Sequence, residues 1–172
     1  LSKTPGAQMG ITEYLNAQMG VEAYVVVADE AQRGPALAAV QALYQFDMEG
    51  TPQAMLLDEF HMHRLGAEID EDQYAQAEVA FFDDVVKGVI ARRDEIDALL
   101  GERLADGWKI ERLDKTLLQN LRAGTYELMA RADVPTATSI SEYIDVAHAF
   151  FDERETKFVN GVLDAVAKAV RT

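Results

Sequence analysis

The chain has 172 residues, 49% of them hydrophobic and 27% charged, which is typical of a globular domain and excludes a disordered chain. Its 30 acidic and 16 basic side chains leave a formal net charge of −14, so on average it repels nucleic-acid phosphates. The absence of cysteine excludes a disulfide framework and a thiolate zinc site, and it fits a reducing compartment.

The first 32 residues have the weakest pattern. The apolar run Tyr24–Ala28 could form a strand, and it is far shorter than the roughly 20 residues that span a bilayer. Residues Leu1–Gly10 lack the basic start and apolar block of a secretory signal. We therefore expect a cytoplasmic protein without a membrane segment, in which residues 1–32 are an extension of uncertain structure and residues 33–172 form a helical domain.

Apolar residues recur at three- and four-residue steps from Pro35 onward, which is the spacing of amphipathic helices. Proline suits a first helical turn, and Gly50 is expected to end this helix. A second helix is expected after Thr51-Pro52, ending at Gly66.

The third apolar stripe is long and begins with a capping box. Asp70 and Gln73 are the residues of that box, and Gly88 and Gly101 are the expected breaks along the stripe.

The remaining helices are predicted in the same way. One follows Gly107-Trp108 and must end before Pro135, because the residue before proline is pushed out of the helical region. Ser139 and Glu142 match a second capping box. Asn160-Gly161 would ordinarily mark a hairpin turn, but the flanking residues keep helical spacing, so the pair is predicted inside a helix. No segment shows sustained alternation, and the fold class is therefore all-α.

Residues for catalysis or metal binding are missing from the sequence. His61 and His63 would point to different sides of a helix, and the third histidine, His148, is far along the chain. There is no Gly-x-Ser-x-Gly motif, no phosphate-binding loop and no dinucleotide fingerprint. We predict a binding protein rather than an enzyme, with no metal and no cofactor.

Charge is unevenly distributed along the chain. Acidic residues crowd positions 58–84, whereas the middle is locally basic. The basic residues there are Arg92, Arg93, Arg103, Lys109, Arg112, Lys115 and Arg122. A basic face on an acidic body is compatible with RNA, and the acidic face would attract a basic protein partner.

Four segments have a recognisable order and spacing. Near the start lies Ala39–Gln45 (AVQALYQ), and the C-terminal third contains Leu121–Leu128 (LRAGTYEL) with Asp133-Val134-Pro135, Ile140–Ala147 (ISEYIDVA) and Lys157–Asp164 (KFVNGVLD). Together they cover about Arg33 to Arg171 and closely resemble the NusB family of transcription antitermination factors. The last segment is the most specific.

This resemblance implies a compact domain of about seven helices, arranged as two packed three-helix bundles. NusB-like proteins bind the boxA element of ribosomal RNA transcripts together with the ribosomal protein NusE. They do so in an antitermination complex with RNA polymerase, and the role uses no cofactor.

The resemblance also suggests the RNA-binding residues. Lys157, Phe158 and Asn160 match the family's motif, and Arg33 is what remains of its arginine-rich N-terminal turn. Aromatic stacking beside cations is a usual way to hold single-stranded RNA. The alternative is that Phe158 and Asn160 pack and cap a helix junction. Gly161 would permit either close helix packing or close approach of a ligand.

Tyr44, Leu117 and Arg122 are the predicted partner-binding residues. Tyr44 matches the NusE-facing tyrosine of relatives, and Leu117 stands where they have an acid. Tyr44 could equally be a half-buried core tyrosine. The apolar stripes suit a monomer or a homodimer.

Two other functions remain open. The missing arginines and the charge of −14 favour a paralogue that binds proteins and has lost RNA binding. A helical RNA-binding domain like those attached to ribosomal RNA cytosine methyltransferases is less favoured, because no nucleotide-binding fold follows before Thr172.

Overall fold

The computed structural model describes residues 34–62, 72–105 and 107–171, with the backbone alone for 72–77, and within these ranges every regular element is a helix. One group comprises α4 (Pro35–Glu49), α5 (Gln53–Phe60) and α6 (Asp72–Ala91). The other comprises α7 (Arg93–Arg103), α8 (Lys115–Ala130), α9 (Thr136–Phe150) and α10 (Glu153–Val170). The short 3₁₀ helix η3 (Ile110–Arg112) lies between α7 and α8. The all-α prediction is confirmed.

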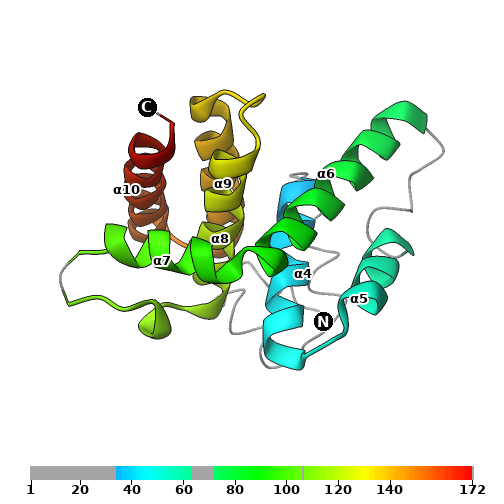
Figure 1. The fold of residues 1–172 in the computed structure, drawn as a ribbon, viewed down its shortest axis with the longest axis horizontal. Coiled ribbons are helices and arrows are strands. Elements are labelled where there is room, and N and C mark those ends of the chain that lie inside the picture. Colours follow the sequence, from blue (N-terminus) through cyan, green and yellow to red (C-terminus); the bar gives the residue numbers. More distant parts are fainter. Residues whose placement is uncertain (1–33, 63–71, 106, 172) are drawn as a thin grey trace.

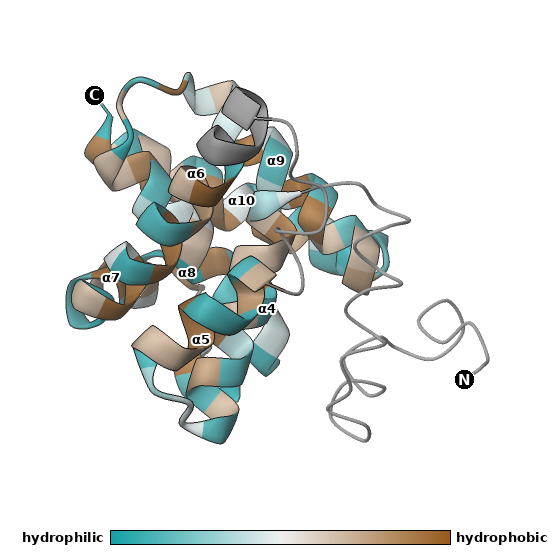
Figure 2. Cartoon of the chain, turned by 90° about the vertical axis from the view of Figure 1, so that its right-hand side faces the viewer, coloured by the Kyte–Doolittle hydropathy of each residue, from teal (hydrophilic) through white to brown (hydrophobic). Residues whose placement is uncertain are grey.

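The two groups lie side by side, with α4, α5 and α6 on the right of Figure 1 and α8, α9 and α10 on the left. Helix α7 runs across α8 and α10 and packs against both. The second group is therefore a three-helix bundle with a fourth helix laid across it. In Figure 2 most helices carry both hydrophilic (teal) and hydrophobic (brown) residues. This is expected for amphipathic helices that each contribute one face to a core.

Helix α8 is the centre of the molecule. It packs against α4, α6, α7, α9 and α10, and all residues from Thr116 to Leu128 are buried. A helix that is covered on every side belongs to the core rather than to a surface layer. Asp114 starts this helix by accepting hydrogen bonds from the backbone N–H groups of Thr116 and Leu117, at 2.8 and 3.1 Å.

Helix α4 begins and ends where the sequence predicts. Pro35 occupies its first turn, and Gly50 ends it in the left-handed conformation with φ of 71°. The backbone N–H of Gly50 donates to the Phe46 carbonyl at 3.0 Å, which satisfies one of the terminal carbonyls.

The expected helix breaks at Gly88 and Gly101 are wrong. The chain bends instead at Arg92, between α6 and α7, while Gly88 lies inside α6 and Gly101 inside α7. Gly88 has a packing reason, since a Cβ built there would overlap the Tyr126 ring.

The capping box at Ser139 and Glu142 is also wrong. Pro135 precedes the first residue of α9, so this helix starts about one turn earlier than predicted. The Ser139 hydroxyl is buried and donates to Glu127 at 2.9 Å.

Several expectations lie outside the described residues. These are the strand at Tyr24–Ala28, the extension 1–32, the Asp70 cap and the stop at Gly66. Among the described helices, none is both long enough and apolar enough to cross a membrane.

Candidate nucleic-acid interface

Helix α10 carries two of the predicted RNA-binding residues, Lys157 and Asn160, on its outer face. Its apolar residues Val159, Val162, Leu163 and Val166 are buried, which turns Lys157, Asn160 and Gly161 toward solvent. Two glutamates in its first turn and Lys168 in its last turn suit the helix dipole. The prediction that Asn160-Gly161 lies inside a helix is confirmed.

Lys157 is held only loosely. Its Nζ lies 3.5 Å from Glu153 Oε2, and both side chains are 76% exposed. An ion pair this exposed contributes little, so the ammonium can exchange its carboxylate for a phosphate at small cost.

Gly161 has open space above it. No atom outside its own helix would lie within 4 Å of a Cβ at this position. Close helix packing, one of the two predicted reasons for this glycine, is therefore wrong. The other reason, the close approach of a ligand across the helix, remains a prediction.

A groove runs between α9 and α10 on one side of Lys157. Its volume is about 470 Å³, and Ile144, His148 and Phe151 form part of its wall. Lys157 and Asn160 line it from α10. Two of the predicted RNA-binding residues thus share one surface depression.

Phe158 faces the other side of α10. It is half-buried and packs against the core, as the alternative interpretation of this residue expected. Its ring also meets the indole of Trp108, with 6.1 Å between the ring centroids and 44° between the planes. Trp108 comes from the loop between α7 and α8 and is 53% exposed. The sequence analysis assigned it no role, although an isolated tryptophan after a glycine in a loop was an available signal.

The predicted partner-binding residues lie together along the contact between α4 and α8, but they are buried. Tyr44, Leu117 and Arg122 are 1%, 6% and 5% exposed. Burial, followed by the charges of Asp114 and Glu49, raises the pKa of Tyr44. Because these three side chains expose almost no surface, the structure does not favour direct contacts between them and a partner.

Arg122 is buried because it joins α8 to its neighbours. Its Nε and Nη2 donate to the two oxygens of Asp97, each at 2.8 Å, and its Nη1 lies 3.5 Å from Asp47. Asp47 also accepts from Arg93 at 2.6 Å and from Gln119 at 3.0 Å. Bidentate pairing of this kind fixes geometry as well as contributing energy.

The predicted basic face is smaller than the sequence suggests. Four of its seven cations are paired with acids, namely Arg92, Arg93, Arg103 and Arg122. The other three, Lys109, Arg112 and Lys115, are exposed and have no ion-pair partner within the described ranges. They follow Trp108 in the chain and lead into the start of α8. Arg33 lies outside the described residues.

Of the three histidines, His61 and His148 lie among the described residues. His61 Nε2 lies 2.6 Å from Asp83 Oδ1, so the His61 side chain pairs with a carboxylate on α6. No cluster of three or more potential metal ligands occurs in the described part of the chain.

Comparison with known proteins points to one family. The NusB family model matches residues 35–168. A transcription antitermination protein NusB from Novosphingobium aromaticivorans is 70% identical over 145 residues, covering 84% of this chain and 98% of the relative. Its counterpart from Sphingopyxis alaskensis is 64% identical over 135 residues, covering 78% of this chain and 91% of that protein.

Solved structures agree with these sequence matches. Thermotoga maritima NusB superposes with a TM-score of 0.66 at 29% identity, covering 79% of this chain and 89% of that one. A crystal structure of the antitermination factors NusB and NusE in complex with double-stranded RNA gives a TM-score of 0.67 at 25% identity. That match covers 81% of this chain and 98% of the other.

Proposed function

The chain belongs to the NusB family, and from this membership we propose that it is a transcription antitermination factor that binds boxA RNA together with NusE. The observation that carries the proposal is the outer face of α10, where Lys157, Asn160 and Gly161 of the family's motif are exposed in one place. A crystal structure of NusB and NusE in complex with double-stranded RNA, among its structural relatives, supports the same role.

The RNA strand is proposed to cross α10 at Gly161. Lys157 would hold a phosphate, and Asn160 would meet a base edge or the backbone at the rim of the α9–α10 groove. Phe158 contributes through its exposed edge only, because it is half-buried. Arg33 is the proposed contact at the N-terminal side of the domain, which we place at residues 33–172.

NusE is proposed to bind over the contact between α4 and α8. There Tyr44, Leu117 and Arg122 would shape the surface from beneath rather than touch the partner. The net charge of −14 would speed the encounter with a basic partner. The role requires no catalysis, and it places the protein in the cytoplasm with RNA polymerase.

The test is the fluorescence anisotropy of labelled boxA RNA, titrated with the protein alone and with purified NusE at two salt concentrations. We expect salt-sensitive binding that tightens with NusE. Capture of NusE without any RNA binding in either condition would overturn the RNA role and favour the protein-binding paralogue.

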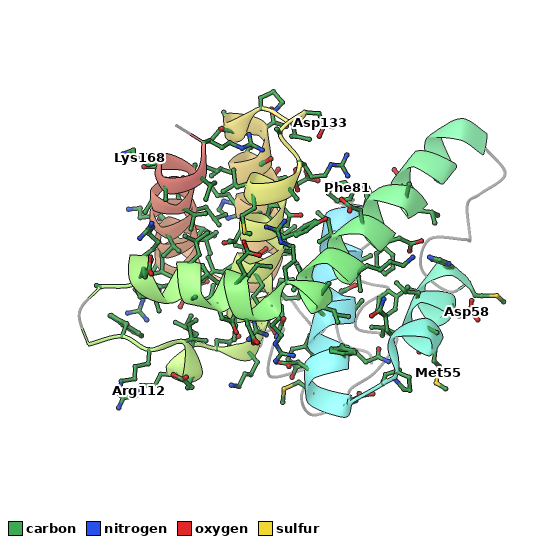
Figure 3. All side chains as sticks on the ribbon, in the orientation of Figure 1. Met55, Asp58, Phe81, Arg112, Asp133 and Lys168 are labelled. Carbon is green, nitrogen blue, oxygen red and sulfur yellow. The ribbon has the colours of Figure 1, made fainter. Side chains whose placement is uncertain are left out.

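A pair of lysines on α10 allows a matched comparison. Lys157 and Lys168 each pair with an acid four residues earlier, and their side chains are 76% and 78% exposed. We expect Lys157→Gln to weaken boxA binding and to reduce the salt slope by about 0.7, which is one single-strand phosphate contact. Lys168→Gln, near the C-terminal end of the same helix (Figure 3), should change neither quantity. If both substitutions weaken binding equally, α10 attracts the RNA only through its overall charge and Lys157 makes no specific phosphate contact.

A further inference from the structure

Trp108 is an exposed aromatic with a fixed position. Tryptophan is usually well covered in folded proteins, yet this indole is 53% exposed while one part of it packs on Phe158. Phe158 is in turn packed against the core. The indole therefore contacts a side chain that is packed against the core, and about half of its surface stays exposed.

One backbone hydrogen bond closes the turn that carries Trp108. Gly107 adopts a φ of 89°, and the Trp108 N–H donates to the Ala105 carbonyl at 3.0 Å. Immediately afterwards η3 forms, with Ile110 packed against the core and Leu113 buried. An aromatic presented by an ordered loop loses little conformational freedom when it binds a ligand.

The sequence around Trp108 carries no net charge, although the chain as a whole is strongly acidic. Between residues 102 and 115, four acidic side chains are balanced by four basic ones. Lys109 and Arg112 are exposed and have no ion-pair partner in the described ranges, although Glu111 lies between them. Arg112 projects outward from this loop in Figure 3. Two exposed cations beside Trp108 are therefore available to hold phosphates next to a stacked base.

We propose that the exposed face of Trp108, supported by Phe158, is a platform on which one unpaired nucleobase of the RNA stacks, with Lys109 and Arg112 holding the neighbouring phosphates. This inference rests on the proposed function and extends its RNA surface from α10 onto the α7–α8 loop. Lys157 and Phe158 are neighbours in α10, so the platform and the proposed phosphate contact lie on adjoining faces of this helix. Stacking of this kind tolerates any base, because every base has a π-face.

The chain itself supplies the probe, since Trp108 is its only tryptophan. Titration of the full-length protein with unlabelled boxA RNA should quench the intrinsic fluorescence in parallel with the binding measured by anisotropy of labelled RNA. A single-stranded RNA lacking the boxA sequence should quench in proportion to its own weaker binding. Unchanged emission at RNA saturation would overturn the platform.

Substitution gives the second readout. Trp108→Ala is expected to weaken RNA binding roughly 5- to 100-fold, the range for loss of one base–aromatic stack. Trp108→Phe should restore most of the affinity, which separates stacking from a loss of loop structure. Met55→Ala serves as the control, because Met55 is a 59% exposed hydrophobic on α5 at the far side of the molecule (Figure 3).

The outcomes also separate this inference from the proposed function. RNA binding at wild-type affinity by Trp108→Ala overturns the platform and leaves the RNA role intact. Absence of RNA binding by the wild-type protein overturns both. A blue shift of the emission on adding NusE, without quenching by RNA, would assign Trp108 to a protein contact and overturn the RNA platform.

Discussion

Three glycines inside helices differ in what surrounds them. At Gly88 a Cβ would overlap the ring of Tyr126, whose hydroxyl donates to Asp84 at 2.8 Å. At Gly101 and Gly161 nothing lies near enough to meet a Cβ. Packing therefore requires a glycine at position 88, whereas positions 101 and 161 have room for a larger side chain.

Replacing these glycines should change stability in opposite directions. Gly88→Ala must displace a buried, hydrogen-bonded tyrosine, and we expect the free energy of unfolding to fall by about 1–3 kcal/mol. Gly101→Ala fills open space in a helix and should raise it by up to about 1 kcal/mol. Urea denaturation followed by circular dichroism measures both. A neutral Gly88→Ala would show that the Tyr126 ring moves aside freely.

At the scale of elements, α8 is fastened at both ends. Asp114 caps its start, and Arg171, just beyond α10, binds the carbonyls at its end. The Arg171 guanidinium donates to the carbonyls of Leu128, Arg131 and Val134 at 2.9, 2.7 and 2.7 Å. The residue that follows α10 thereby joins this helix to the end of α8 and to the turn before α9.

Loss of this clamp should destabilise the fold. Arg171→Ala leaves several carbonyls without a charged donor, and we expect the free energy of unfolding to fall by about 2 kcal/mol. Arg171→Lys should recover only part of the loss, because an ammonium cannot reach three carbonyls with the geometry of a planar guanidinium. Lys168→Ala, on the exposed face of α10, is the control in the same thermal melts. If Lys restores full stability at position 171, charge rather than geometry holds the two helices.

At the scale of the whole molecule, acidic groups meet in the core between α8 and α9. Glu127 is buried, and Glu142 is half-buried near it. Burial, with the charges of Glu127 and Asp145, raises the pKa of Glu142 from 4.5 to about 7. The folded protein therefore binds a proton here more tightly than the unfolded chain does.

This raised pKa makes stability depend on pH. Below pH 4.5 the group is protonated in both states, and its contribution is fully present. As the pH rises from about 4.5 to about 7, the unfolded chain loses the proton first, so the free energy of unfolding falls and then levels off. Glu142→Gln should remove this part of the decline and be more stable than wild type at pH 8.

Urea denaturation at several pH values between 4.5 and 8 checks the prediction. Glu111→Gln removes the same charge from an exposed position on η3 and is the control. If the free energy of unfolding changes with pH in the same way for wild type and Glu142→Gln, Glu142 is not the source of the predicted decline.

Local pattern was enough to predict much of this protein. Proline and glycine at the ends of α4, and the apolar stripe of α10, indicated those helices. The motif around Lys157 also indicated the NusB family. These features depend on residues within a few turns of one another, and the helical period exposes them directly.

Other features arise from contacts between distant segments. Trp108 lies 50 positions before Phe158, and the contact between their rings depends on how the α7–α8 loop folds back onto α10. Tyr44, Leu117 and Arg122 were expected at a surface but lie beneath it, because α8 has neighbours on every side. A periodic pattern tells which face of a helix is apolar, whereas the number of helices that cover its other faces is a property of the packed molecule.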